Sequence, residues 1–61
     1  MKVKIIKASK PTYWYANKIG CVFEVKEVIW RGKKEYRLIK DNSYIIHIED
    51  TKTEKVKVIL V

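Results

Sequence analysis

The sequence has one cysteine, one proline and two glycines in 61 residues. The single Cys21 cannot close an internal disulfide, so the chain lacks the framework of a small secreted protein stapled by cystines. Cys21 and the only histidine, His47, are too few for a four-ligand structural zinc site within one chain. Two glycines also leave no glycine-rich phosphate loop. We therefore expect neither a bound metal nor a cofactor.

Long apolar segments are missing as well. The run Val58–Val61 is far shorter than the roughly 20 residues that a membrane helix needs. Lysines alternate with aliphatic residues over Met1–Lys7, where a signal peptide would carry an unbroken apolar stretch. We expect this segment to be a strand of a protein that works in a reducing cytoplasm, without a membrane.

Acidic residues are scarce and unevenly placed. The chain has 14 Lys and Arg against 7 Asp and Glu, which gives a formal net charge of +7. Residues 1–20 contain no acid, whereas acids slightly outnumber bases in residues 41–61. The total charge favours a polyanionic partner. Its placement weakens that inference, because the basic excess belongs to the first two-thirds of the chain, where much of it alternates with core positions.

The sequence also has little material for catalysis. A chain of 61 residues buries only about 60% of its unfolded surface and leaves little room for an active-site cavity. The candidate nucleophile and base, Cys21 and His47, fall on different predicted strands, with Cys21 facing the core and His47 facing out. Glu49 and Asp50 are adjacent, so on a strand they would point to opposite faces. We expect a protein that is not an enzyme.

Apolar and polar residues alternate with a period of two along most of the chain, which predicts strands with one buried face. The predicted strands cover residues 2–5, 21–30, 35–39, 44–48 and 55–61. In the second of them the alternation slips at Lys26–Glu27, which predicts a β-bulge there. Phe23 and Tyr36 are expected in the core.

Polar segments connect these strands. Arg31–Lys34 and residues 41–43 are predicted turns, and residues 49–54 should hold a tight turn. Lys10–Gly20, with the only proline, is predicted to be an ordered loop between the first two strands. Thr51 and Glu54 have the spacing of a capping box, but the β-branched run behind them argues against a following helix.

The pattern predicts an all-β fold: one domain over residues 1–61, built as a small closed five-stranded antiparallel barrel. In such a barrel the first and last strands meet, which covers edges that would otherwise invite aggregation. The apolar last strand suits a position covered on both sides.

Several segments resemble a known group of proteins. They are Pro11–Gly20, with its Tyr-Trp-Tyr run, Val22–Val25, Tyr36-x-Leu38 and Tyr44–Asp50. Together these resemble the small SH3-like barrel proteins of bacteriophages and prophages of Gram-positive bacteria, over roughly residues 3–50. The resemblance implies an SH3-like barrel and an accessory role in a phage or prophage, and it implies no catalytic residues.

Aromatic residues in a loop suit protein recognition, because they offer large contact areas at low entropic cost. The predicted contact surface comprises Tyr13, Trp14, Tyr15, Trp30 and Arg31. It would bind a host or phage protein and modulate or block its action, as an inhibitor or adaptor. The alternative is that these rings fold back to fill the small core.

The basic residues support a second hypothesis, in which a small basic β-barrel binds nucleic acid. The residues concerned are Lys2, Lys4, Lys7, Arg31, Lys33 and Lys34. The signal is not specific, because alternating lysines also keep an exposed strand soluble, and a solvated face is the more common explanation. A third possibility is a homo-oligomer in which Val58–Val61 completes a sheet between chains.

Overall fold

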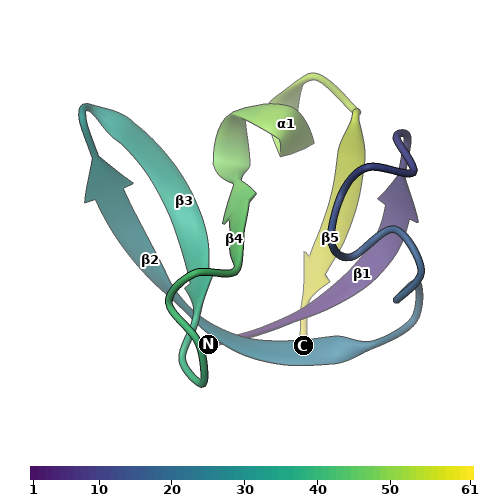
Figure 1. Cartoon of the computed structure of the whole chain (residues 1–61), viewed down its shortest axis with the longest axis horizontal. Coiled ribbons are helices and arrows are strands. Elements are labelled where there is room, and N and C mark those ends of the chain that lie inside the picture. Colours follow the sequence, from purple (N-terminus) through teal and green to yellow (C-terminus); the bar gives the residue numbers. More distant parts are fainter.

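The computed structural model describes residues 1–61 and contains five antiparallel strands and one short helix (Figure 1). The elements are β1 (Lys2–Ala8), β2 (Val22–Trp30), β3 (Lys33–Leu38), β4 (Ile45–His47), α1 (Ile48–Lys52) and β5 (Val56–Leu60). They form one sheet in the order β4-β3-β2-β1-β5. The predicted all-β class is confirmed, as is the meeting of the first and last strands.

Strand β2 belongs to both halves of this sheet. Its first residues pair with β1 and the remainder pairs with β3, and Figure 1 shows how the long strand curves to reach both. A short helix, α1, precedes the last strand. The predicted closure of the barrel is wrong, because β4 and β5 are not paired. Strand β4 has only three residues, and α1 follows it directly and contacts both edge strands.

The core lies on the concave side of the bent sheet. Five aliphatic residues from four of the strands have exposed fractions of 0–1%: Val3, Ile5, Val25, Ile46 and Val56. Phe23 and Tyr36 are half-buried and pack against this cluster, as the alternation predicts. Period-two alternation therefore identifies the inner face wherever a strand crosses the core.

The predicted bulge at Lys26–Glu27 is wrong. Residues 25–30 of β2 pair with β3 in continuous register, and the irregularity lies in β1 between Ile5 and Lys7. The β2–β3 hairpin extends beyond the core, so Ile29 on its inner face and Trp30 on its outer face are both exposed. Apolar residues at this tip carry no information about which face is buried.

Two expectations of burial are also wrong. Cys21 is exposed, because it lies in the loop before β2, where only backbone hydrogen bonds to Ile5 and Lys18 hold it. The last strand is not covered on both sides: Leu60 and Val61 are 66% and 61% exposed. Strand β5 lies at an edge of the sheet, and its end extends past the core.

The connections mostly follow the prediction. Residues 10–20 form an ordered loop of successive turns, in which Tyr13, Ala16 and Lys18 each donate a backbone hydrogen bond to the residue three positions earlier. The segment 49–54, predicted as a tight turn, begins as the single helical turn of α1 and ends in a turn at residues 53–54. Within α1 the Thr51 hydroxyl donates a hydrogen bond to the Ile48 carbonyl at 2.6 Å. His47 is exposed, as expected.

Candidate functional site

The three successive aromatic residues of the 10–20 loop fold toward the core. Tyr15 is 2% exposed, and Tyr13 and Trp14 are half-buried. The rings of Tyr13 and Tyr15 stack with centroids 5.1 Å apart, and the Trp14 ring meets Tyr15 edge-on at 5.2 Å. Tyr15, which the sequence places on the contact surface, is therefore a core residue, because a domain this small needs large rings to fill its interior.

Trp14 joins this loop to the strands. Its ring lies 5.3 Å from that of Phe23 and 5.1 Å from that of Tyr44. Its indole Nε1 donates a hydrogen bond to the Ile45 carbonyl oxygen at 2.8 Å. That carbonyl lies on the free edge of β4, so Trp14 both fills the open side of the barrel and satisfies an edge acceptor.

Burial raises the pKa of the Tyr15 hydroxyl, and Tyr13 and Asp50 raise it further. In the unfolded chain the Tyr15 hydroxyl loses its proton at about pH 10, whereas in the folded protein this hydroxyl stays protonated above that pH. The folded state thus binds more protons, so its stability should fall as the pH rises beyond about 10. We expect Tyr15→Phe to reduce this alkaline loss, measured as melting temperature against pH. An unchanged slope would contradict the burial of this hydroxyl.

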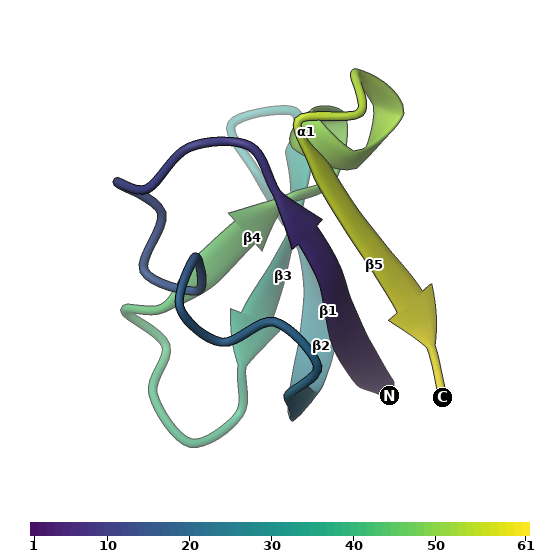
Figure 2. The ribbon, with the colours of Figure 1, turned by 90° about the vertical axis from the view of Figure 1, so that its right-hand side faces the viewer.

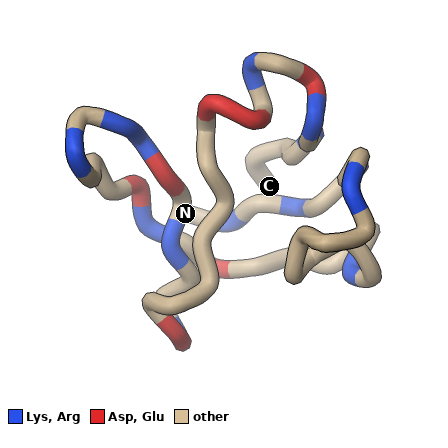
Figure 3. Tube along the Cα trace, turned by 45° about the horizontal axis from the view of Figure 1, so that its top comes forward, with Lys and Arg blue, Asp and Glu red and all other residues tan.

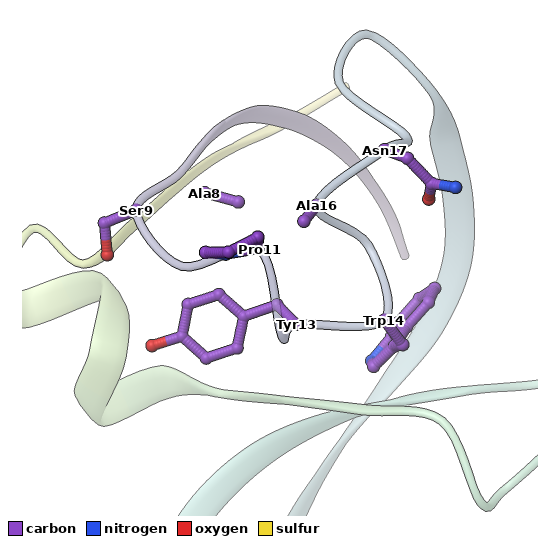
Figure 4. Close-up of a pocket in the computed structure, with 7 residues that line it drawn as sticks. All are labelled: Ala8, Ser9, Pro11, Tyr13, Trp14, Ala16 and Asn17. Atoms are coloured by element: carbon purple, nitrogen blue, oxygen red, sulfur yellow. The ribbon is translucent and has the colours of Figure 1, made fainter.

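The same loop surrounds a shallow hollow of about 550 Å³ (Figure 4). Its lining residues are Ala8, Ser9, Pro11, Tyr13, Trp14, Ala16 and Asn17. Figure 4 shows the Tyr13 hydroxyl and the Asn17 amide directed away from the centre of the hollow. The polar groups therefore do not converge on a common point, and we assign no ligand to this hollow.

A second aromatic site lies on the outer face of the β2–β3 hairpin. Trp30 is 55% exposed, and the guanidinium carbons of Arg31 and Arg37 lie 5.7 and 5.6 Å from its ring centroid. These distances are those of cation–π contacts. We call Trp30, Arg31, Arg37 and Glu35 the Trp30 cluster. The sequence pattern indicates Trp30 and Arg31 as contact residues but gives no sign of Arg37, although the alternation along β3 places Arg37 on the same face as Lys33.

Glu35 is the anchor of this cluster. It is 3% exposed even though it lies on the outer face of β3, opposite Val28. The Arg37 Nε donates to the Glu35 Oε2 at 2.9 Å, and the Arg37 side chain continues to the Trp30 ring. The arginine thus covers and neutralises the carboxylate, as a buried charge requires. The alternation alone predicts Tyr36 and Leu38 as the inward residues of β3, and it gives no sign that Glu35 is buried.

The turn of the hairpin sets the position of Arg31. Arg31 and Gly32 have φ angles of 52° and 78°, and the flanking residues Trp30 and Lys33 pair directly. Two positive φ angles define the two-residue turn that favours Asn-Gly, so an arginine here carries strain of about 1–2 kcal/mol. This conformation holds the Arg31 guanidinium over Trp30, and strain of this kind is often retained at functional sites.

Register extends this face beyond the hairpin. Lys26 pairs with Arg37, Lys4 pairs with Val22, and Lys7 pairs with Lys57, all on the side of the sheet away from the core. We call the cations on this side the outer basic face. Its members are Lys2, Lys4, Lys7, Lys26, Arg31, Lys33, Arg37 and Lys57.

The outer basic face carries little opposing charge. Glu24, opposite Lys2, is its only exposed acid, and Glu35 is paired with Arg37. Acidic segments lie mainly around α1 and in the 41–43 turn (Figure 3). Lys33 approaches Glu49 of α1 at 3.8 Å, but both side chains are exposed, so the pair is weak.

The structure separates one predicted basic residue from the others. Lys34 pairs with Ile29 and so lies on the inner side of the hairpin, opposite to Lys33. The hairpin and the far end of β1 also lie on different sides of the molecule (Figure 1). The basic residues therefore follow a curved surface and do not form one compact patch.

No protein-family model, curated protein or solved structure matches this chain. None of its helices has the length and apolar character needed to cross a bilayer. No three His, Cys, Asp or Glu side chains are grouped so that they could hold a metal ion.

Proposed function

We propose that this protein is a non-catalytic binding module that holds the backbone of a single-stranded nucleic acid on its outer basic face. The observation that carries the proposal is the placement of eight cations on one side of the sheet, where Glu24 is the only exposed acid. Cations that contact phosphates release condensed counterions, which makes such a surface attractive to nucleic acid of any sequence.

The Trp30 cluster supplies the second component of such a site. An exposed indole can stack on a base, which contributes about 1–3 kcal/mol per base in proteins that bind single strands. The Trp30 ring contacts Arg37, whose own position is fixed by its hydrogen bond to buried Glu35. The ring is therefore oriented before a ligand arrives, which reduces the entropic cost of binding.

Protein recognition is the second candidate function, and the exposed pair Trp30 and Arg31 supports it. Exposed Trp and Arg side chains dominate many protein interfaces. The other residues of that predicted surface, from Tyr13 to Tyr15, are engaged with the core, which weakens this alternative. In either case we propose an accessory protein of a phage or prophage that works in the host cytoplasm, which is what the resemblance implies.

A salt titration tests the nucleic-acid proposal. We expect binding to a fluorescent single strand of about 15 nucleotides, measured by anisotropy. If about five of the cations contact phosphates, log K should fall with log salt at a slope of about −3.5, or roughly 100-fold between 50 and 200 mM. Absence of binding at low salt would refute the proposal. Capture of one host protein from nuclease-treated lysate, lost in Trp30→Ala, would favour protein recognition instead.

A further inference from the structure

The two edges of the sheet differ in how they are covered. Strand β4 and strand β5 each have one neighbour. On the β4 edge, the outward carbonyl of Ile45 accepts the Trp14 hydrogen bond. On the β5 edge no such cover is present: Figure 2 shows β5 as the outermost strand, with its C-terminal half clear of other elements. An uncovered edge of this kind is a template for a further strand.

The hydrogen bonds between β5 and β1 reveal which groups of this edge are free. Val61 donates its N–H to the Lys2 carbonyl at 3.0 Å. By the antiparallel pattern, the backbone N–H and C=O groups of Val61 and Ile59 therefore point toward β1. The N–H and C=O groups of Val58 and Leu60 then point outward. Neither residue has a hydrogen bond outside the β1–β5 pairing.

The side chains along this edge are apolar and exposed. Ile59, Leu60 and Val61 are 42%, 66% and 61% exposed, and they follow one another without a charge. Natural edge strands usually carry charges or proline at such positions to prevent pairing. Strand β5 has only Lys57, near its start.

We infer that β5 is a dimerisation edge, on which the β5 strand of a second copy of this chain pairs antiparallel about a two-fold axis. The charge pattern of the strand supports a second copy as the occupant. With the axis at Val58, Lys57 faces Ile59 of the other copy, and with the axis at Ile59, Lys57 faces Val61. In both registers each Lys57 lies opposite an aliphatic side chain, whereas an axis at Lys57 or at Val56 would place lysines opposite each other.

Pairing in this way would use both free backbone groups of Val58 and of Leu60 and cover the exposed aliphatic residues beside them. It would also join the two sheets into one, which removes the bare β5 edge from both copies. The net charge of +7 on each copy opposes association. Added salt should therefore strengthen the dimer, because it screens this repulsion.

The test is the mass of the chain in solution, measured by sedimentation over a range of protein and salt concentrations. We expect the mass to rise from 7.3 kDa to twice that value with concentration, and at lower concentration when salt is added. A monomer at every concentration up to the millimolar range would overturn the inference. That result would also be expected if the β5 edge binds an extended peptide of another protein and not a second copy of this chain.

Three variants locate the interface. Ile59→Lys places two lysines opposite each other in both registers, so it should weaken the dimer at least tenfold. Ile29→Lys adds the same charge at an exposed aliphatic residue of the hairpin and should leave the dimer unchanged. Leu60→Pro removes an outward N–H without breaking a bond to β1, so it should also abolish the dimer. Melting curves verify that each variant folds. If Leu60→Pro does not fold, the result for Ile59→Lys alone tests the inference.

Persistence of the dimer in folded Ile59→Lys or folded Leu60→Pro would overturn the inference. Equal loss in Ile29→Lys would overturn it as well, because total charge and not the β5 edge would then control association. These readouts do not depend on nucleic-acid binding, so the inference and the proposed function can fail separately.

Discussion

Replacing Trp14 with alanine is expected to remove much of the free energy of unfolding of the protein. The change removes a ring that contacts Tyr15, Phe23 and Tyr44, and it leaves the Ile45 carbonyl without its indole donor. Truncation of a large aromatic residue in a core costs about 3–5 kcal/mol. A domain of 61 residues has a total stability of roughly 3–9 kcal/mol, so this loss removes much of it. Urea denaturation followed by circular dichroism measures the effect.

Two variants separate the contributions of the Trp14 side chain. Trp14→Phe keeps an aromatic ring but loses the hydrogen bond, so we expect a loss of about 1 kcal/mol in addition to a repacking cost. Trp30→Ala truncates the same residue type on the exposed hairpin and should change stability by less than about 1 kcal/mol. Equal destabilisation by Trp14→Ala and Trp30→Ala would show that Trp14 is not a core residue. Because we expect Trp14→Ala to destabilise the fold, a loss of ligand binding in that variant would carry no information about an interface.

Reversing two charges on the outer basic face is expected to reduce nucleic-acid affinity at least about 25-fold at 0.1 M salt. In the variant Lys4→Glu/Lys26→Glu, two phosphate contacts are lost. Each phosphate contact with a single strand adds about 0.7 to the magnitude of the salt slope. Relative to 1 M salt, one such contact therefore raises the binding constant about fivefold at 0.1 M salt. The salt slope should therefore become shallower by about 1.4, which the anisotropy titration measures directly.

A matched variant controls for total charge. Lys34→Glu/Lys52→Glu changes the net charge by the same amount, but Lys34 lies on the inner side of the hairpin and Lys52 in α1. We expect this variant to lose only a few-fold in affinity through the long-range field and to keep the slope of the unmodified protein. If both double variants lose the same affinity, the outer basic face is not the binding surface. All four lysines lie outside the buried core, so both proteins should fold.

Local patterns in the sequence predicted most of the fold. The alternation over Lys2–Ile5 and Phe23–Val25 identified the inner residues correctly, because these strands cross the core and water contacts only one of their faces. It failed at Ile29 and Trp30, where the hairpin leaves the core and both faces are wet. The predicted barrel closure failed because pairing of β4 with β5 depends on where α1 lies, and no local pattern encodes that position.

The candidate site was less predictable than the fold. Trp30 and Arg31 were predicted as contact residues from their residue types and their position at a turn. Arg37 was not predicted, because its contact with Trp30 depends on its ion pair with Glu35 on the same face of β3. The similar-looking rings of residues 13–15 went to the core. Aromatic side chains suit both an interior and an interface, so composition does not distinguish the two outcomes.

The sequence by itself determined a small, basic, all-β domain, because period-two alternation, charge balance and chain length act locally or through simple sums. Only the tertiary structure decided which aromatic rings fill the core and which cations share a face. Both depend on strand register and sheet curvature, which bring together residues as distant in sequence as Trp14 and Ile45. The same register places Lys4, Lys26 and Arg37 on one side of the sheet and moves Lys34 to the other. A change of one residue in pairing would reverse these assignments, because successive side chains of a strand point to opposite faces.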